Sequence, residues 1–338
     1  MSDPMSQAPN FEVFSRKRAS RSVTERVIEL VLLLAALSSV GTTIAIMVLL
    51  ISESVGFFKE VPILEFLTSK SWSPLFDNPE YGILPLVSGT LTTTLVALSV
   101  AIPMGTIAAI YLSEFAPQKV REVIKPVLEL LAGIPTVVYG YFALLFVTPL
   151  LQQLYAPLGT LVNGFTEKLP AGGLSDWLYN DVPLDLGGFN MLSAGLVMGI
   201  MITPLISSIS EDAMRSVPTE LREGSYATGA TRFQTAWKVV FPAAMSGISS
   251  SYILGISRAV GETMIVAVAA GLQPIFTFNP LNSAATITAF IVQVSLGDIP
   301  HGSLEYQTIF AAGLVLVLVT LVLNIIGYFL SKRFREEY

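Results

Sequence analysis

The chain has 338 residues, of which 52% are hydrophobic and only 13% are charged, and its mean hydropathy is +0.66. Soluble domains carry about 25% charged residues, so this composition indicates a membrane protein. The lack of cysteine excludes disulfides and thiolate metal sites, and a single histidine, His301, excludes a histidine-based metal cluster or catalytic triad. The net charge of −6 excludes little, because in a membrane protein the positions of Lys and Arg matter more than their sum.

Long apolar stretches recur along the chain. A membrane-spanning helix needs about 20 mostly apolar residues. Such stretches are found at about 27–51, 83–112, 126–151, 190–210, 245–270 and 308–331. We therefore expect an all-α integral membrane protein with six transmembrane helices. They would form one transmembrane domain, residues 27–331, between an N-terminal segment (1–26) and a short tail (332–338).

Among the loops that join these stretches, loops rich in Lys and Arg alternate with loops that have few or none. They are frequent before the first stretch and in the loops 113–125 and 211–244, whereas the loop 152–189 has only Lys168 and the loop 271–307 has none. Loops rich in Lys and Arg stay on the cytosolic side of a membrane. The pattern therefore predicts that the N-terminal segment and the C-terminal tail are both cytosolic.

One cytosolic loop, residues 215–242, is polar, basic and aromatic. Pro218 suits the first turn of a helix and Gly229 suits its end, so we expect a helix from Thr219 to Ala227. A second helical segment is expected at 231–240, before Pro242. The loop thus predicts a pair of short helices at the inner membrane surface.

The spacing of this loop resembles the EAA loop of ABC importer permeases, in which E-A-A is followed by three residues, glycine, nine residues and I-x-L-P. Here Glu223-Gly224-Ser225 is followed by Gly229 and then by Val239-Val240-Phe241-Pro242 at the same spacing. The resemblance implies the type I ABC importer permease fold. It also implies that the loop is a coupling helix seated in a separate ATPase, with Glu223, Gly229 and Pro242 as coupling residues.

An ATPase partner also fits what the sequence lacks. It contains no G-x-x-x-x-G-K-[ST] phosphate-binding loop. We therefore expect no cofactor in this chain, with ATP and Mg²⁺ bound by the ATPase.

The stretch 245–270 carries two charges near its middle. Arg258 lies about 16 Å along it at helical rise, near the bilayer midplane, and Glu262 follows at i+4, on the same face of a continuous helix. A charge at this depth costs at least ~2.5–3.5 kcal/mol and usually marks a functional site, although a structural salt bridge is the alternative. The N–H groups of a guanidinium suit an oxyanion, and a nearby carboxylate would lower the affinity of the guanidinium for that anion. The pair therefore predicts transient passage of a partly protonated anion such as phosphate.

A continuous helix would also connect the loop to this pair. Pro242 precedes Arg258 by 16 residues, or roughly 24 Å of helix. We expect one stiff rod to carry motion of the loop to the anion site.

The residues 258–264 (RAVGETM) resemble the R-A-x-G-E-T-M segment of PstC-type phosphate permeases, and residues 131–140 (LAGIPTVVYG) resemble a second stretch of the same family. This resemblance implies that Arg258 and Glu262 act in the substrate pathway, to which we also assign Thr263. It implies a non-catalytic subunit of a prokaryotic inner membrane. Its partners would be a PstA-type permease, two copies of an ATPase and an extracytoplasmic phosphate-binding protein, with no nucleic acid involved.

Three questions remain open from the residues alone. The cargo could be another oxyanion, such as sulfate or molybdate. An autonomous channel or secondary transporter could use the midspan charges for ion coupling, but it would have no reason to carry the 215–242 loop. Thr92, Thr93 and Thr94 could face a polar path, although helix packing explains them as well.

For Lys125 and Glu129, one turn apart, we expect an ion pair.

Overall fold

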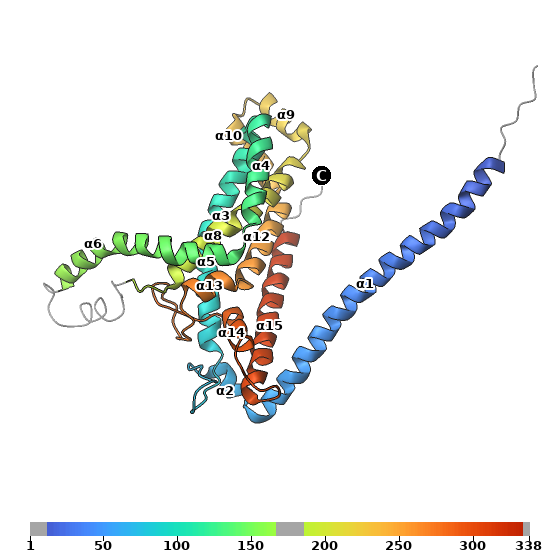
Figure 1. Cartoon of the computed structure of the whole chain (residues 1–338). Coiled ribbons are helices and arrows are strands. Elements are labelled where there is room, and N and C mark those ends of the chain that lie inside the picture. Colours follow the sequence, from blue (N-terminus) through green and yellow to red (C-terminus); the bar gives the residue numbers. More distant parts are fainter. Residues whose placement is uncertain (1–11, 167–185, 334–338) are drawn as a thin grey trace, which may run out of the picture. The chain divides into compact units, whose positions relative to one another are not determined.

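The computed structural model describes residues 12–166 and 186–333, and Figure 1 shows their helices. Residues 1–11 of the N-terminal segment, 167–185 of the loop 152–189 and 334–338 of the tail lie outside the described residues. Within the described part, extended pairing is limited to two isolated β-bridges, so the expectation of an all-α protein is confirmed. The chain divides into two units, Met1–Glu53 and Ser54–Tyr338.

The first unit consists, in its described part, of most of α1 (Glu12–Glu60). The span Glu25–Glu60 has a mean hydropathy of 2.3. Its apolar side chains between Val27 and Ile51 are largely exposed on all sides of the helix. A helix that is apolar all round is suited to lipid or to another protein surface.

The core of the second unit is the contact between α3 (Leu84–Ile110) and α8 (Met191–Arg215). Glycines on α8 allow the two backbones to approach closely, since a Cβ atom on Gly199 would lie 2.7 Å from the carbonyl oxygen of Ala97. The three threonines Thr92, Thr93 and Thr94 are buried in α3. Their burial favours helix packing over a polar path.

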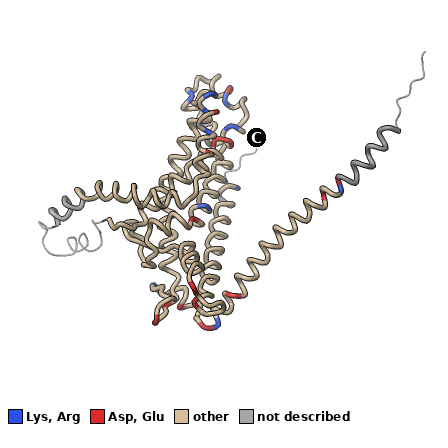
Figure 2. Tube along the Cα trace, in the orientation of Figure 1, with Lys and Arg blue, Asp and Glu red and all other residues tan. Residues whose placement is uncertain are grey.

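The remaining spans pack around this core. α12 (Met245–Val260) contacts α8, α3 and α15 (Leu304–Arg333), and α13 (Met264–Ala269) contacts α5 (Thr136–Phe142) and α8. The other helices are α2 (Ile63–Thr68), η1 (Tyr111–Phe115), α4 (Gln118–Ala132), η2 (Ala143–Val147), α6 (Thr148–Thr166), α9 (Thr219–Ala227), α10 (Arg232–Thr235), η3 (Ala236–Val240), α11 (Phe241–Ala243) and α14 (Ile287–Ser295). The three segments labelled η are π-helical turns. Figure 2 shows that charged residues of this unit gather toward its two ends and are sparse between them.

Two expected spans differ from the structure. Residues 126–132 belong to the amphipathic helix α4, and the third span begins only at Thr136, because Gly133 and Pro135 interrupt the helix. The stretch 245–270 is divided between α12 and α13 at residues 261–263. Among the described residues, five helices are long and apolar enough to cross a membrane. A bent pair that includes α12 would make a sixth.

Candidate functional site

The break between α12 and α13 is built around Glu262. Its carboxylate oxygen Oε1 accepts the backbone N–H groups of Met264 and Ile265, at 3.2 and 3.4 Å, and so caps the start of α13. Its backbone carbonyl accepts the hydroxyl of Thr288 in α14 at 2.7 Å. Glu262 is buried, at 7% exposure, so these bonds hold the break in a fixed conformation.

The expected pairing of Glu262 with Arg258 on one helical face is therefore wrong. α12 ends at Val260, and Glu262 lies beyond that end with its carboxylate turned to the α13 backbone. In the described part of the chain, no ion pair joins the two side chains. A spacing of four residues places two side chains on one face only within an unbroken helix, and α12 ends before Gly261.

Arg258 lies in the last turn of α12 and is exposed. Among the side chains that the structure describes, none forms an ion pair or a hydrogen bond with it. At the α4–α5 break, the hydroxyl of Tyr139 donates to the carbonyl of Leu131 at 2.9 Å. Thr263 is half-buried, and its hydroxyl makes only a long contact of 3.4 Å to the Gly261 carbonyl. Within the described part of the chain, Arg258 is therefore a guanidinium without a partner, three residues before the break between α12 and α13.

The second candidate region is the pair of short helices between α8 and α12, residues 219–243, which we name the hairpin. α9 ends at Ala227, and Gly229 follows with φ of +82°, the left-handed conformation that favours glycine. The next turn starts at Thr231, whose side chain caps the backbone of Gln234 while Gln234 caps Thr231 in return. A hydrogen bond of 2.9 Å between the Ser225 and Thr235 hydroxyls joins the two halves.

Arg222 fastens the hairpin to the membrane helices, a role that sequence reasoning missed. Its guanidinium forms a salt bridge of 2.9 Å with Glu114 in η1, and it donates to the carbonyls of Val217 and Met214 at 2.7 and 2.8 Å. Both charged side chains are mostly buried. The sequence shows a carboxylate, Glu114, immediately after the second span. Nothing in the spacing of residues connects it with Arg222, which lies 108 positions away.

The hairpin exposes three aromatic side chains among its polar and charged residues. Tyr226, Phe233 and Trp237 are 43%, 64% and 51% exposed. Glu223 is also exposed, and it has no ion pair or side-chain hydrogen bond in the described part of the chain. Pro242 is exposed in the single turn α11. Exposed aromatic side chains grouped with an unpaired carboxylate are typical of a protein-binding surface.

A third cluster of charges joins α4 to the end of α8. The carboxylate of Glu211 is fully buried, and Arg121 Nε and Lys125 Nζ each lie 2.8 Å from one of its oxygens, while Arg215 Nε lies 3.8 Å away. The contact to Arg121 is an ion pair without hydrogen-bond alignment. Lys125 also pairs with Asp212. We call this group the Glu211 cluster.

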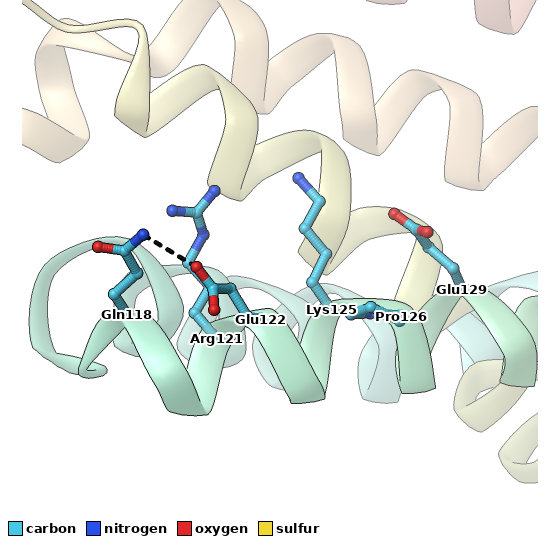
Figure 3. A pocket seen from close by; sticks show the side chains of 6 residues that line it. All are labelled: Gln118, Arg121, Glu122, Lys125, Pro126 and Glu129. Atoms are coloured by element: carbon cyan, nitrogen blue, oxygen red, sulfur yellow. Dashed lines mark hydrogen bonds between the residues drawn. The ribbon is translucent and has the colours of Figure 1, made fainter.

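Figure 3 shows the α4 side of this cluster, a pocket of about 410 Å³ in which Arg121 and Lys125 extend from α4 toward the neighbouring helix. The expected Lys125–Glu129 pair is wrong, because Lys125 turns to α8. Burial acts to lower the pKa of Lys125, but its hydrogen bonds to Asp212 and Glu211 outweigh burial and raise that pKa above the ordinary value. Lys125 thus stays charged at neutral pH.

The expectation of one continuous helix from Pro242 to Arg258, a stiff rod, is also wrong. The axis of Arg232–Ala243 and that of Met245–Val260 differ by 72°, with the bend at Ala244. The hairpin is instead connected to the spans through this bend and through Arg222. No group of three potential metal ligands was found among the residues that the structure describes.

Comparison with known proteins places these regions in context. Residues 101–336 match the family described as binding-protein-dependent transport system inner membrane component. The chain is 34% identical over 318 residues to the probable ABC transporter permease YqgH of Bacillus subtilis, with 94% of each chain covered. It is 33% identical to the phosphate transport system permease PstC of Xylella fastidiosa, over 81% of this chain and 80% of that one. For PstC of Mesorhizobium japonicum the identity is 32%, over 95% and 96%.

Solved structures give the same fold. A bacterial alginate ABC transporter in complex with an alginate-bound periplasmic protein matches with a TM-score of 0.59 at 16% identity, over 93% of this chain and 96% of that one. A bacterial ABC transporter involved in alginate import matches with a TM-score of 0.57 over 94% and 100%. At this identity the likeness shows the fold alone. Together with the family match, it shows that this chain belongs to the inner membrane components of binding-protein-dependent transport systems and is a non-catalytic permease subunit of an ABC importer.

Proposed function

We propose that this permease carries inorganic phosphate, as the PstC-type subunit of its importer. Two observations support the cargo. The PstC relatives are 32–33% identical over at least four fifths of the chain, and the segment 258–264 carries the R-A-x-G-E-T-M pattern. The name of the relative YqgH specifies no cargo, so a direct measurement of the transported anion is required.

The observation that carries the proposal is the exposed Arg258. A guanidinium inside the hydrocarbon region costs several kcal/mol unless a counter-charge or water reaches it. In the described part of this chain, no carboxylate forms an ion pair with Arg258. An anion that passes along the exposed face of α12 would supply the counter-charge, bound through the two parallel N–H groups that suit an oxyanion.

Glu262 and Thr263 have supporting roles in this proposal. Glu262 fixes the α12–α13 break that follows Arg258, and its negative charge limits how tightly an anion is held. Thr263 offers a hydroxyl without a short internal bond. A moderate affinity suits transport, because a site that binds its anion too tightly releases it slowly.

Coupling to ATP hydrolysis is the second part of the proposal. The hairpin would dock on a separate ATPase through Glu223 and the exposed aromatic side chains, with Gly229 setting its turn and Pro242 its exit to α12. Arg222 and the bend at Ala244 would pass its displacement to the spans.

The complete importer would contain a PstA-type permease beside this chain, two copies of the ATPase on the cytosolic side and a phosphate-binding protein outside. Both termini of this chain would be cytosolic, as the loop charges favour. ATP and Mg²⁺ would bind to the ATPase. Closure of the ATPases would move the hairpins and turn the cavity from inward-facing to outward-facing.

The cargo is tested by reconstituting the complex in proteoliposomes with ATP inside. We expect binding protein loaded with phosphate, but not one loaded with sulfate or molybdate, to stimulate ATP hydrolysis and uptake. Stimulation by a sulfate-loaded or molybdate-loaded protein alone would replace phosphate with that anion. Uptake by this chain without any ATPase would reject the importer mechanism and support a secondary transporter.

Docking of the hairpin is tested by Glu223→Lys. Because Glu223 has no ion pair or side-chain hydrogen bond in the described part of the chain, the variant should fold normally but lose ATPase binding or stimulation of ATP hydrolysis. Arg232→Glu, which also reverses an exposed charge of the hairpin, serves as the control for a non-specific charge effect. Normal co-purification and normal stimulation of Glu223→Lys would exclude a docking role for this carboxylate.

A further inference from the structure

A groove between α12 and α15 carries polar side chains on the outside of this unit. The two helices run side by side (Figure 1), and the groove has a volume of about 410 Å³. Its polar lining consists of Ser250 and Ser257 from α12 and of Asn324, Tyr328 and Ser331 from α15. The mechanism derived above uses none of these five residues.

The polar groups follow one another along the groove. At one end the Ser331 hydroxyl donates to the carbonyl of Ser246 at 3.3 Å, and at the other end the Ser257 hydroxyl donates to Asn324 Oδ1 at 2.8 Å. Ser257 immediately precedes Arg258. From Ser246 to Ser257 the helical rise is about 16 Å, so the polar groups extend from the hairpin end of α12 to the exposed guanidinium.

These groups do not belong to the protein core. Asn324 and Ser250 are exposed, and Tyr328 is 62% exposed. In the described residues, the amide nitrogen of Asn324 and the hydroxyl of Tyr328 have no hydrogen-bond partner within the chain. A polar group that faces hydrocarbon without a partner costs free energy, so an amide at this depth requires water or another polar ligand.

The opposite face of α15 is different. Val322 and Ile326 are about half exposed and apolar, as expected of a lipid-facing surface. At 3.6 residues per turn, both lie at least about 120° around the helix from Asn324 and Tyr328, so the polar groove residues are kept to the other face. On α12 itself, Ser250, Leu254 and Arg258 follow at intervals of four residues and are all exposed, so the groove adjoins the face that presents Arg258.

We propose that this groove is the water-filled path along which the anion travels between Arg258 and the cytosol. Serine hydroxyls, the tyrosine hydroxyl and the asparagine amide donate hydrogen bonds to an oxyanion without carrying a charge. They can replace part of its hydration shell and still release it. This inference rests on the proposed function, which makes the hairpin end of α12 cytosolic and the cargo an oxyanion.

Single-cysteine variants test the path directly, since the chain has no cysteine of its own. Ser250→Cys, Ser257→Cys and Asn324→Cys are placed in the complete transporter in inside-out vesicles. Val322→Cys and Ile326→Cys, on the apolar face of α15 that is turned away from the groove, are the matched controls. A charged methanethiosulfonate reagent is added from the cytosolic side, and modification of this chain is followed by mass spectrometry.

We expect the groove positions to react at least about tenfold faster than the controls, because the reagent requires a hydrated thiolate. Inorganic phosphate trapped by turnover should slow the reaction at Ser257→Cys, next to Arg258. Modified Ser257→Cys should lose most uptake, whereas modified Val322→Cys should not.

Equal and slow modification at all five positions would overturn the proposal, because lipid or a partner helix would then fill the groove. Fast modification without loss of uptake would show a hydrated groove that is not the anion path and would also overturn it. Neither result depends on which anion is transported. Failure of the phosphate assignment would instead appear in the uptake assay of the unmodified complex.

Discussion

Two charged regions of the second unit contrast in how they are satisfied. The Glu211 carboxylate is fully buried and is surrounded by Arg121, Lys125 and Arg215, all supplied by this chain. Arg258 lies at the exposed end of α12 with no partner in the described residues. The first region stabilises the contact between α4 and α8. The second leaves a charge without a counter-charge in the described part of the chain.

This contrast separates structural charges from functional ones. A buried charge needs partners from its own fold, because leaving it unpaired is strongly unfavourable. A charge that serves a passing ligand must remain accessible between transport events. The same distinction applies in the hairpin, where Arg222 is engaged by Glu114 but Glu223 is free of internal ion pairs in the described part of the chain.

The largest effect on stability is expected for Glu211→Ala. Removing the carboxylate leaves Arg121 and Lys125 partly buried without their main counter-charge, at a cost of about 3–5 kcal/mol. Asp212→Ala is the control, because Asp212 is 61% exposed and its pair with Lys125 should contribute less than about 1 kcal/mol. Thermal denaturation of the purified complex measures both. Equal midpoints for the two variants would contradict a structural role for the Glu211 cluster.

An intermediate effect is expected for Arg222→Met. The variant keeps the apolar stem but loses the salt bridge to Glu114 and two bonds to carbonyls, which should cost about 1–3 kcal/mol and loosen the hairpin. Arg232→Met, on the same hairpin, removes an exposed arginine and should change the midpoint little. Hydrogen exchange of residues 219–243 compares the two variants. Unchanged protection in Arg222→Met would show that this arginine does not fasten the hairpin.

The smallest effects separate two exposed glycines of the hairpin. Gly229 has a φ of +82°, so Gly229→Ala should cost about 1–2 kcal/mol although its Cβ would meet no atom within 4 Å. Gly224 lies inside α9 with the same free space, so Gly224→Ala should stabilise the helix by roughly 0.5–1 kcal/mol. Shifts of the denaturation midpoint in the same direction would contradict the backbone argument.

The sequence was sufficient for the helical membrane fold and for the position of the hairpin. Hydropathy is averaged over about 20 residues and charge over whole loops, so single residues change these predictions little. Gly229 marks a local turn that few other residues tolerate. The sequence was not sufficient where a helix is interrupted within an apolar stretch. Gly133, Pro135 and Gly261 occur at the breaks, but glycine and proline are also tolerated inside membrane helices.

Contacts between distant segments could not be predicted either. The pairing of Arg222 with Glu114 joins residues 108 positions apart, and Lys125 bonds to Glu211 across 86 positions. Spacing along one helix favoured Glu129 for Lys125 and Glu262 for Arg258. In both cases the fold supplied a different environment. Pair predictions at i+4 therefore need an unbroken helix and a free partner.

Uptake by the Arg258→Gln variant tests the central claim most directly. The variant is reconstituted with its complete transporter, and binding-protein-dependent phosphate uptake is measured together with assembly of the complex. The proposed role predicts loss of nearly all uptake with an intact complex and a normal denaturation midpoint, because Arg258 has no partner to lose among the described residues. Arg258→Lys should retain part of the uptake, since it keeps the charge without the guanidinium fork. Near-normal uptake by Arg258→Gln would contradict the claim that this guanidinium binds the passing anion.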